Sequence, residues 1–409
     1  MTETTSFLRV FALWAAGLGA AAQYGKMSVI FDLLPGLYPQ AGASLGFLVS
    51  LVGSVGILLG VVAGLVVARI RYRRALLSAL WLGAGVSAFQ ALTPGFGWML
   101  TSRVVEGLSH LAIVVAAPTL IAQLSAPKDR GFTLTLWGTF FGVAFAILAL
   151  AGRPLALSFG LPALFAAHAL YMAACALVLA ASLRRLPAEE PQPPFSLPQI
   201  FRDHLTIYRS PFLSAPAAGW LFYTFSFVSI LTVLPPYLDE SWRAPVMAAM
   251  PLTSIAVSMT LGVLLLRRLF AVQVVQMGFG LSALSMAWLW LSPGAPLACI
   301  ALAGAMGLIQ GASFTAVPQL NQGAAAQAQA NGAVAQMGNL GNSIGTPIMA
   351  FGLATLGASA LPLFAGGAFL MGLGAHVLLA AARRRSRRVP VWFSLFRWKI
   401  RHQHLCTKR

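Results

Sequence analysis

The sequence predicts an all-α polytopic membrane protein whose twelve transmembrane helices form two pseudo-symmetric six-helix bundles. Three observations predict this fold: the apolar composition, the regular recurrence of apolar runs and an internal repeat. Of the 409 residues, 58% are hydrophobic and only 9% are charged, whereas a soluble domain has roughly 25% charged residues. So few charges cannot cover a water-exposed surface, so we expect a lipid bilayer to surround most of the chain.

Apolar runs of bilayer-spanning length follow one another along the chain, broken by Gly, Pro or clusters of charge. The first run is too long for a cleaved signal peptide and is expected to remain as a helix. We expect helices at residues 7–33, 43–68, 74–93, 97–124, 131–153, 158–183, 211–237, 244–267, 270–291, 294–319, 328–355 and 359–383.

A segment rich in charge and proline separates the first six expected helices from the last six. The expected domains are an N-terminal bundle (1–183), a cytoplasmic linker (184–210), a C-terminal bundle (211–383) and a basic cytoplasmic tail (384–409). The tail interleaves Trp and Phe with Arg, which suits attachment to anionic lipid or, as the alternative, a solvated anchor.

The two halves repeat one another at an offset of about 200 residues. Pro118 corresponds to Pro318, and Leu161-Pro162 corresponds to Leu361-Pro362. Duplicated bundles that face each other bind a substrate at their interface and expose it alternately to the two sides of the membrane.

The positive charge indicates a topology. Of the 27 Lys and Arg residues, all but four fall at both chain ends and in the even-numbered connections. Two of those four, Arg153 and Arg243, lie on the other side, and Lys26 and Arg103 lie within expected helices. By the positive-inside rule both termini are cytoplasmic in a cell inner membrane. The net charge of +18 is therefore a topology signal, and no nucleic-acid partner is expected.

Several motifs resemble those of the major facilitator superfamily. GLVVARIRYRR, from Gly64 through Arg69 and Arg73 to Arg74, is similar to the loop that follows that family's second helix. It departs from the family pattern at Ala68, where an acid is usual, and at Arg71, where a second glycine is usual. The resemblance implies a gating loop that includes Gly64, Arg69 and Arg73.

Two further segments carry the resemblance. RVVEG, from Arg103 to Gly107, resembles the family's Arg-x-x-Gln-Gly motif, and DRG at Asp129 to Gly131 matches the loop that follows. The family's antiporter signature contains a Gly-Pro, whereas WGTFFGVAF, from Trp137 to Phe145, has no proline. This difference weighs against an exporter.

Ionisable residues within the expected helices indicate where a substrate binds. Arg103, Glu106 and His110 fall within roughly 100° of arc on one helix, and Lys26 lies at the depth of Arg103 and Glu106. Intramembrane charges are expensive and normally face protein or a water-filled cavity. Two cations and one anion leave a surplus positive charge that would attract an anionic substrate, and His110 or Glu106 would exchange a proton. Alternatively, Glu106 only ties the helices together.

The C-terminal half offers amides and aromatic residues in place of charges. Gln336 and Asn339 belong to one polar stripe that could line the cavity or tie helices together. Phe222, Tyr223 and Phe225 are candidates for an aromatic wall. His168 and His376 have no ionisable partner at helical spacing and are expected to be hydrogen-bonded histidines packed between helices.

These features predict a secondary active transporter that works by alternating access, with a small organic anion and a proton as partners. One alternative is an exporter of drug-like or amphipathic compounds, and another is a non-transporting sensor or scaffold on the carrier fold. No nucleotide-binding loop or catalytic constellation occurs, so we expect neither an enzyme nor a cofactor. The three cysteines lack metal-binding spacing, and we expect a monomer without a metal site.

Overall fold

The computed structural model describes residues 4–60, 67, 71–184 and 197–388. Nine helical stretches in the described part of the chain are long and apolar enough to cross a membrane, and the last of them, Gln329–Ser386, contains two helices. Helices α1 and α5 complete twelve spans. Polar side chains such as Arg9 and Lys26 lower the hydropathy of α1, although it is long enough to span.

The N-terminal half (N-half) contains six spans. The first is α1 (Phe7–Ser28), followed by η1 (Phe31–Leu33) and α2 (Leu34–Leu37), and the second consists of η2 (Gly42–Leu45), α3 (Gly46–Ser50) and η3 (Leu51–Gly53) and continues to Gly60. The third is α5 (Tyr72–Gln90), and the fourth is α6 (Phe96–Leu124). The fifth consists of α7 (Arg130–Gly138), α8 (Phe140–Ile147), η4 (Leu148–Gly152) and α9 (Arg153–Phe159), and the sixth is α10 (Leu161–Ser182).

The C-terminal half (C-half) repeats this plan. Its spans are α12 (Ser214–Val233) with η5 (Pro235–Tyr237); α13 (Glu240–Val257), η6 (Ser258–Gly262) and α14 (Val263–Leu266), which form one span; α15 (Ala271–Leu291); α16 (Pro296–Leu320); α17 (Ala324–Leu356) with η7 (Gly357–Ser359); and α18 (Ala360–Arg388).

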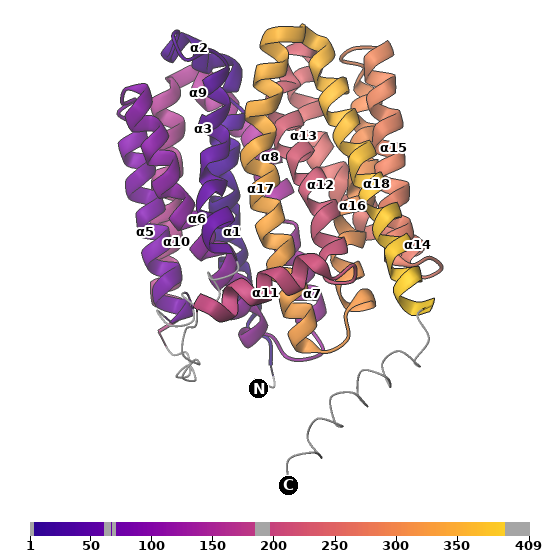
Figure 1. Cartoon of the computed structure of the whole chain (residues 1–409). Coiled ribbons are helices and arrows are strands. Elements are labelled where there is room, and N and C mark those ends of the chain that lie inside the picture. Colours follow the sequence, from indigo (N-terminus) through magenta and orange to yellow (C-terminus); the bar gives the residue numbers. More distant parts are fainter. Residues whose placement is uncertain (1–3, 61–66, 68–70, 185–196, 389–409) are drawn as a thin grey trace.

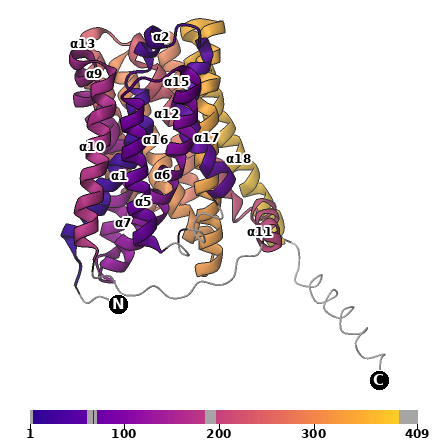
Figure 2. The same cartoon turned by 90° about the vertical axis from the view of Figure 1, so that its left-hand side faces the viewer.

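The two halves stand side by side, with the spans running between two ends of the molecule (Figure 1). We call the end where α1 begins and α18 ends the terminal face, and the other end the opposite face. Helix α11 (Leu197–Arg209) lies crosswise at the terminal face, where Figure 2 shows it nearly end-on. This helix falls within the segment for which the sequence predicts only a linker.

The fifth span is longer than the sequence predicts. Its helix continues beyond residue 153 to Phe159, and Gly160 with φ +84° then turns the chain into α10. A left-handed backbone is a natural end for a helix, since glycine adopts it without a steric penalty. Pro162 follows at the start of α10, where a missing N–H costs no intrahelical hydrogen bond.

Apolar packing holds the halves together toward the opposite face. One buried cluster stays within the N-half, between α1, α5, α6 and α10, whereas another joins both halves. Ser28 hydrogen-bonds Thr232 across the seam at 2.7 Å, and the Ser343 hydroxyl donates to the Ser50 carbonyl at 3.2 Å. We use the word seam for this boundary between the halves.

Candidate functional site

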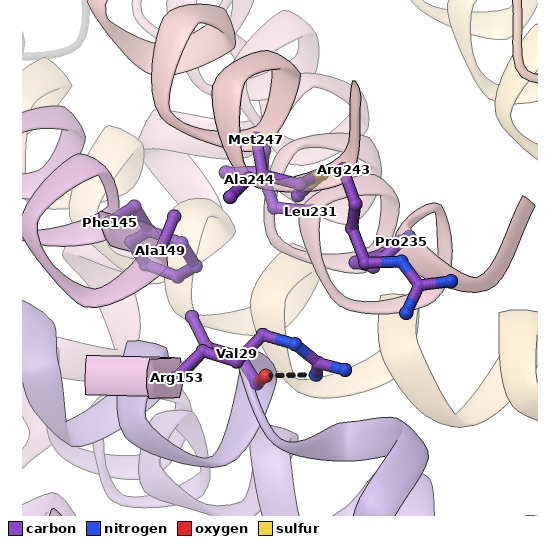
Figure 3. A pocket seen from close by; sticks show the side chains of 9 residues that line it. All are labelled: Val29, Phe145, Ala149, Arg153, Leu231, Pro235, Arg243, Ala244 and Met247. Carbon is purple, nitrogen blue, oxygen red and sulfur yellow. Dashed lines mark hydrogen bonds between the residues drawn. The ribbon is translucent and has the colours of Figure 1, made fainter. Parts of the chain in front are cut away.

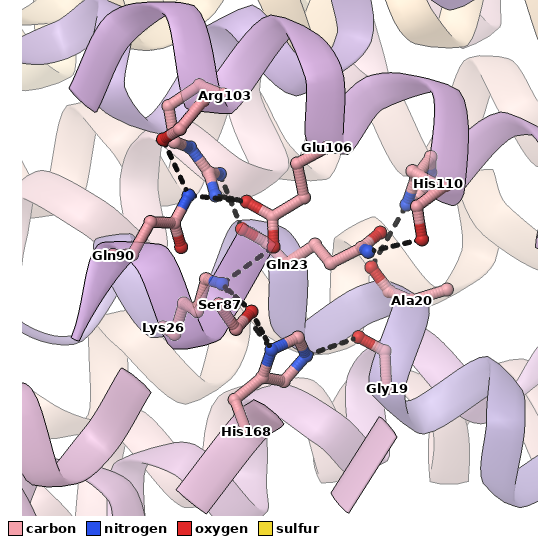
Figure 4. A network of polar contacts seen from close by, with 12 residues as sticks. Gly19, Ala20, Gln23, Lys26, Ser87, Gln90, Arg103, Glu106, His110 and His168 are labelled. Atoms are coloured by element: carbon pink, nitrogen blue, oxygen red, sulfur yellow. Dashed lines mark hydrogen bonds and ion pairs between the residues drawn. The ribbon is translucent and has the colours of Figure 1, made fainter. Parts of the chain in front are cut away.

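A buried ion triad forms where α1 meets α6. The Lys26 ammonium lies 2.6 Å from one carboxylate oxygen of Glu106, and Arg103 pairs with the other oxygen from one helical turn away. All three side chains are fully buried. The contact between Lys26 and Glu106 agrees with the depth that the sequence predicts for Lys26. Figure 4 shows the three side chains converging from two helices.

Backbone carbonyls satisfy the rest of the Arg103 guanidinium. It donates to the Leu48 carbonyl at 2.6 Å and also to the Gln23 carbonyl. These groups come from α3 and α1, so Arg103 joins three spans. A guanidinium group holds its N–H donors in a rigid plane, which suits several acceptors at fixed positions. With Lys26 and Arg103 facing one carboxylate, the triad keeps a surplus of one positive charge.

The triad extends to α5 and α10. Lys26 donates to the Ser87 hydroxyl at 2.7 Å, Ser87 lies 2.7 Å from Nδ1 of His168, and Nε2 of His168 lies 3.0 Å from the Gly19 carbonyl. A carbonyl only accepts, so Nε2 carries the proton and Nδ1 accepts from Ser87. The Gln90 amide donates to Glu106 at 3.0 Å. We call the set Lys26, Ser87, Gln90, Arg103, Glu106 and His168 the N-half network.

Three members of the network were absent from the sequence-predicted site. Ser87 and Gln90 lie three residues apart on one face of α5, a spacing that could have indicated a polar stripe. His168 is a hydrogen-bonded histidine packed between helices, as the sequence predicts, but it also lies 3.4 Å from the Lys26 ammonium. Helical spacing could not indicate this contact, because the two residues lie on different helices.

His110 lies beside the network without bonding to Glu106. Its Nδ1 lies 3.0 Å from the Ala20 carbonyl, so this nitrogen carries a proton. Its ring meets the Tyr24 ring edge to face, with the ring centroids 5.1 Å apart. Tyr24 also packs against Phe141 at 5.9 Å. Tyr24 therefore links His110 to the fifth span, which borders the seam.

Gln336 and Asn339 lie at the seam, apart from the buried cations. The Gln336 amide donates to the Ile57 carbonyl at 3.2 Å and accepts from the Tyr208 hydroxyl of α11 at 2.7 Å. Asn339 packs on Gly56, where a Cβ would come within 2.6 Å of all three atoms of its amide group. The amide stripe of α17 thus contacts the second span of the N-half.

The gating-loop residues are only partly described. Gly64 and Arg69 lie outside the described residues. Arg73 donates to the Ala180 carbonyl of α10 at 3.2 Å. Arg71, which takes the place of a family glycine, has φ +74° immediately before α5.

His376 corrects one prediction. It is fully buried on α18, yet neither ring nitrogen has a hydrogen-bond partner among the residues that the structure describes. It packs on Gly219, where a Cβ would lie 2.1 Å from Nε2, and near the Phe279 ring at 6.0 Å. Close approach of α12 and α15 around the ring leaves its polar edge without an acceptor or donor.

Aromatic side chains cross the seam. Phe141 and Phe145 of α8 each lie 6.2 Å from Phe227 of α12, measured between ring centroids. The array continues through Tyr223 to Trp220, which stack at 4.6 Å. Of the three predicted wall residues, Tyr223 belongs to this array, whereas the Phe225 backbone packs against Gly341 and Gly345 of α17.

Among the described residues there is no cluster of His, Cys, Asp and Glu side chains suited to a metal ion. Two helical halves with paired spans, a seam between them and a buried ionisable network define a membrane carrier. The Major Facilitator Superfamily model matches residues 10–346, so the chain belongs to that family. It is a multi-pass membrane transporter of small molecules and not an enzyme.

Solved structures show the same fold. A bacterial homologue of the human lysosomal transporter Spinster, in an inward-facing and unoccupied conformation, superposes with a TM-score of 0.70 at 13% identity over 93% of this chain and 96% of that one. Its inward-facing, occupied form gives a TM-score of 0.72 at 14% identity over 94% and 98%. Comparison with curated proteins gives no match.

Proposed function

We propose that this transporter carries a small organic anion and couples its movement to a proton through the N-half network. The observation that supports the proposal is the triad of Lys26, Arg103 and Glu106, fully buried with one surplus positive charge. Ionisable groups cost several kcal/mol within a bilayer, so their presence there favours a functional role.

Glu106 is the favoured proton site because it contacts both cations. Protonating its carboxylate would remove the counter-charge of Lys26 and Arg103 at once and leave both free to hold an anion. His110 is the alternative, but its Nδ1 is already engaged by the Ala20 carbonyl. Tyr24 packs between His110 and Phe141, so a substrate that approached the cations past Phe141 would displace its ring.

The test is transport by the full chain reconstituted in liposomes with a panel of mono- and dicarboxylates. We expect Glu106→Gln to abolish accumulation driven by a proton gradient while exchange of substrate between the two sides persists. Glu240→Gln makes the same chemical change on an exposed residue and should leave both activities intact. If a folded Glu106→Gln protein lost both exchange and accumulation, Glu106 would serve to hold helices together and not to carry a proton.

A second candidate, transport of amphipathic compounds, is favoured by the aromatic array across the seam. Phe141, Phe145, Phe227 and Tyr223 offer stacking surfaces to a flat apolar molecule. Thermal stabilisation by neutral or cationic aromatic compounds that is unaffected by Lys26→Met would favour this candidate over the anion carrier.

The proposal includes an inner-membrane location, cytoplasmic termini and a monomer as the working unit. The family favours transport over the sensor or scaffold alternative. Residues 1–183 and 211–383 would move as the two rocking units, with 184–210 as the linker between them.

A further inference from the structure

Helix α11 packs on the C-half through one side of its surface. Ile207 is only 1% exposed and lies in an apolar cluster with Val317 of α16 and Val334 of α17. The helix runs crosswise at the terminal face, and Figure 2 shows it at the edge of the bundle. Because it lies at the level where the spans end, α11 is fixed to the C-half at the depth of a membrane surface.

The side of α11 that faces away from the C-half is both basic and apolar. At about 100° per residue, Arg202 and Arg209 point within roughly 20° of each other, and Leu205 lies roughly 40–60° from both. Ile207 points roughly 140–160° away from the two arginines. Arg202 and Arg209 are exposed, and Leu205 is 40% exposed. Arginines beside an exposed apolar side chain suit the surface of an anionic bilayer, where they meet headgroup phosphates.

The same helix reaches the seam through one side chain of α17. The Tyr208 hydroxyl donates to Oε1 of Gln336 at 2.7 Å, and Nε2 of Gln336 donates to the Ile57 carbonyl of the second span at 3.2 Å. A carbonyl only accepts, so the Gln336 amide must turn its NH₂ group toward Ile57, and the Tyr208 hydroxyl holds the amide in that orientation. We call Tyr208, Gln336 and Ile57 the α11 bridge.

The α11 bridge lets the position of α11 influence whether the halves part. Without the Tyr208 hydroxyl, the Gln336 side chain regains rotational freedom, and ordering it against Ile57 then costs conformational entropy. Gln336 lies in the half of α17 that is nearer the terminal face, which is the face that α11 crosses. An interaction that holds α11 in place therefore also helps to hold the second span against α17.

We propose that α11 binds the surface of an anionic bilayer through Arg202, Leu205 and Arg209, and that the α11 bridge transmits this binding to the seam. Anionic lipid thus keeps Tyr208 on Gln336 and favours the conformation described here over those in which the second span leaves α17. The inference goes beyond the proposed anion transport and does not depend on the substrate. It requires only that the two halves move against each other.

Lipid binding is tested on the full chain with a fluorophore attached to Leu205→Cys, in a background without native cysteines. The protein is placed in phosphatidylcholine nanodiscs that contain quencher-labelled lipid, with or without phosphatidylglycerol. We expect phosphatidylglycerol to raise the ratio of quenched to unquenched fluorophore roughly fivefold or more, which is the contribution of one arginine near an anionic surface. Combining Arg202→Gln with Arg209→Gln should remove the increase, whereas Arg268→Gln, on the exposed turn between α14 and α15, should retain it.

The link to the seam is tested by thiol labelling of Gly60→Cys in the same background. A Cβ at Gly60 would lie 3.5 Å from the Gln336 Cα, so the thiol is placed where the second span meets α17. We expect labelling to be roughly threefold to tenfold faster in Tyr208→Phe, which loses one hydrogen bond, and slower when phosphatidylglycerol is present. Tyr171→Phe is the matched control, because its hydroxyl donates to the Ala15 carbonyl within the N-half, and it should leave the rate unchanged.

The two measurements separate lipid binding from its effect on the seam. Tyr208→Phe should keep the lipid-dependent quenching but lose the lipid dependence of labelling, since it breaks the bridge and leaves both arginines in place. Quenching that does not respond to phosphatidylglycerol would overturn the lipid surface. A labelling rate that is unchanged by Tyr208→Phe, or that still responds to lipid in that variant, would overturn the bridge. Should the double arginine variant fail to fold, high salt screens the same charges and should remove the increase in quenching.

Discussion

At the scale of single residues, Glu106 has the most demanding environment. It is fully buried and accepts hydrogen bonds from Lys26, Arg103 and Gln90, which come from three helices. Removing one partner of a buried ion pair is far more costly than removing both, because it leaves an uncompensated charge.

We therefore expect Glu106→Gln to lower the free energy of unfolding by about 3–5 kcal/mol. Adding Lys26→Met to that variant should recover part of the loss, since one unmatched cation is then removed. Denaturant or thermal unfolding of the purified variants measures both effects. Strict additivity of the two substitutions would contradict a direct Lys26 to Glu106 coupling.

Arg71 carries the clearest backbone strain in the described residues. Its φ of +74° lies in the region that side chains with a Cβ disfavour, and it immediately precedes α5. Such conformations cost of the order of 1–3 kcal/mol in non-glycine residues.

Arg71→Gly should raise the free energy of unfolding by about 1 kcal/mol. Arg74→Gly removes the same charge from an exposed position inside α5 and should instead lower it by roughly 0.5–1 kcal/mol, because glycine weakens a helix interior. Melting curves of the two variants side by side test the contrast. Equal changes in melting temperature for the two variants would mean that the lost charge, and not the backbone conformation of Arg71, determines the effect on stability.

At the scale of elements, glycines set how closely spans approach. A Cβ on Gly46 would lie 2.7 Å from the Pro347 Cα of α17, across the seam. A Cβ on Gly341 would lie 2.4 Å from the Leu221 carbonyl, within the C-half. Small residues at such crossings let helix backbones pack closely in a membrane, where no hydrophobic force drives helices together. Gly46 thus allows the close approach of helices across the seam, and Gly341 allows the close approach of helices within the C-half.

Gly46→Leu should wedge the seam apart at the opposite face while each half keeps its fold. We expect Ser28→Cys, placed in a background without native cysteines, to react at least fivefold faster with a membrane-impermeant thiol reagent when Gly46→Leu is added. Gly85→Leu is the matched control, because a Cβ there meets nothing within 4 Å. An unchanged labelling rate in a folded protein would show that Gly46 does not control closure.

Two spans that meet across the seam share a local irregularity. The fifth span has a π-helical turn at Leu148–Gly152, and the C-half span beginning with α13 has another at Ser258–Gly262. Such turns interrupt the regular hydrogen-bond ladder and often occur at functional positions. Ala149 of the first turn lines a small pocket between the halves together with Leu231 and Met247 (Figure 3), so this irregularity lies at the seam.

At the scale of the whole molecule, contacts between the halves concentrate from the opposite face toward the middle of the spans. Gly46 packs on Pro347, Ser28 bonds Thr232, and Gly142 packs on Ile255. A carrier that is closed at one end opens at the other. We infer that this conformation opens toward the terminal face.

The charge distribution predicts that the terminal face is cytoplasmic. Green fluorescent protein fused after Arg388 should fluoresce, and alkaline phosphatase fused after Pro39, between the first two spans, should be active in bacterial cells. Reporter assays on the two fusions measure the orientation directly. If the fluorescent-protein fusion did not fluoresce and the phosphatase fusion were inactive, the proposed topology would be wrong and the inverted one would hold.

The sequence alone determined the membrane class, the number of spans, the repeat and the face of α6 that carries Arg103, Glu106 and His110. Each follows from local periodicity, which a helix converts directly into a face or a length. The added length of the fifth span and the crosswise α11 escaped prediction, because their ends depend on neighbouring packing.

Only the tertiary structure decided which helices surround the charges and which way they face. Ser87 and His168 join Lys26 from α5 and α10, and Arg153 lines one small pocket with Arg243 of the other half. The physical reason is that lipid-facing and protein-facing apolar side chains look alike in a sequence, since lipid tails are as apolar as leucine. The rotation of each helix about its axis, and therefore its polar partners, is set by packing between spans distant in the chain.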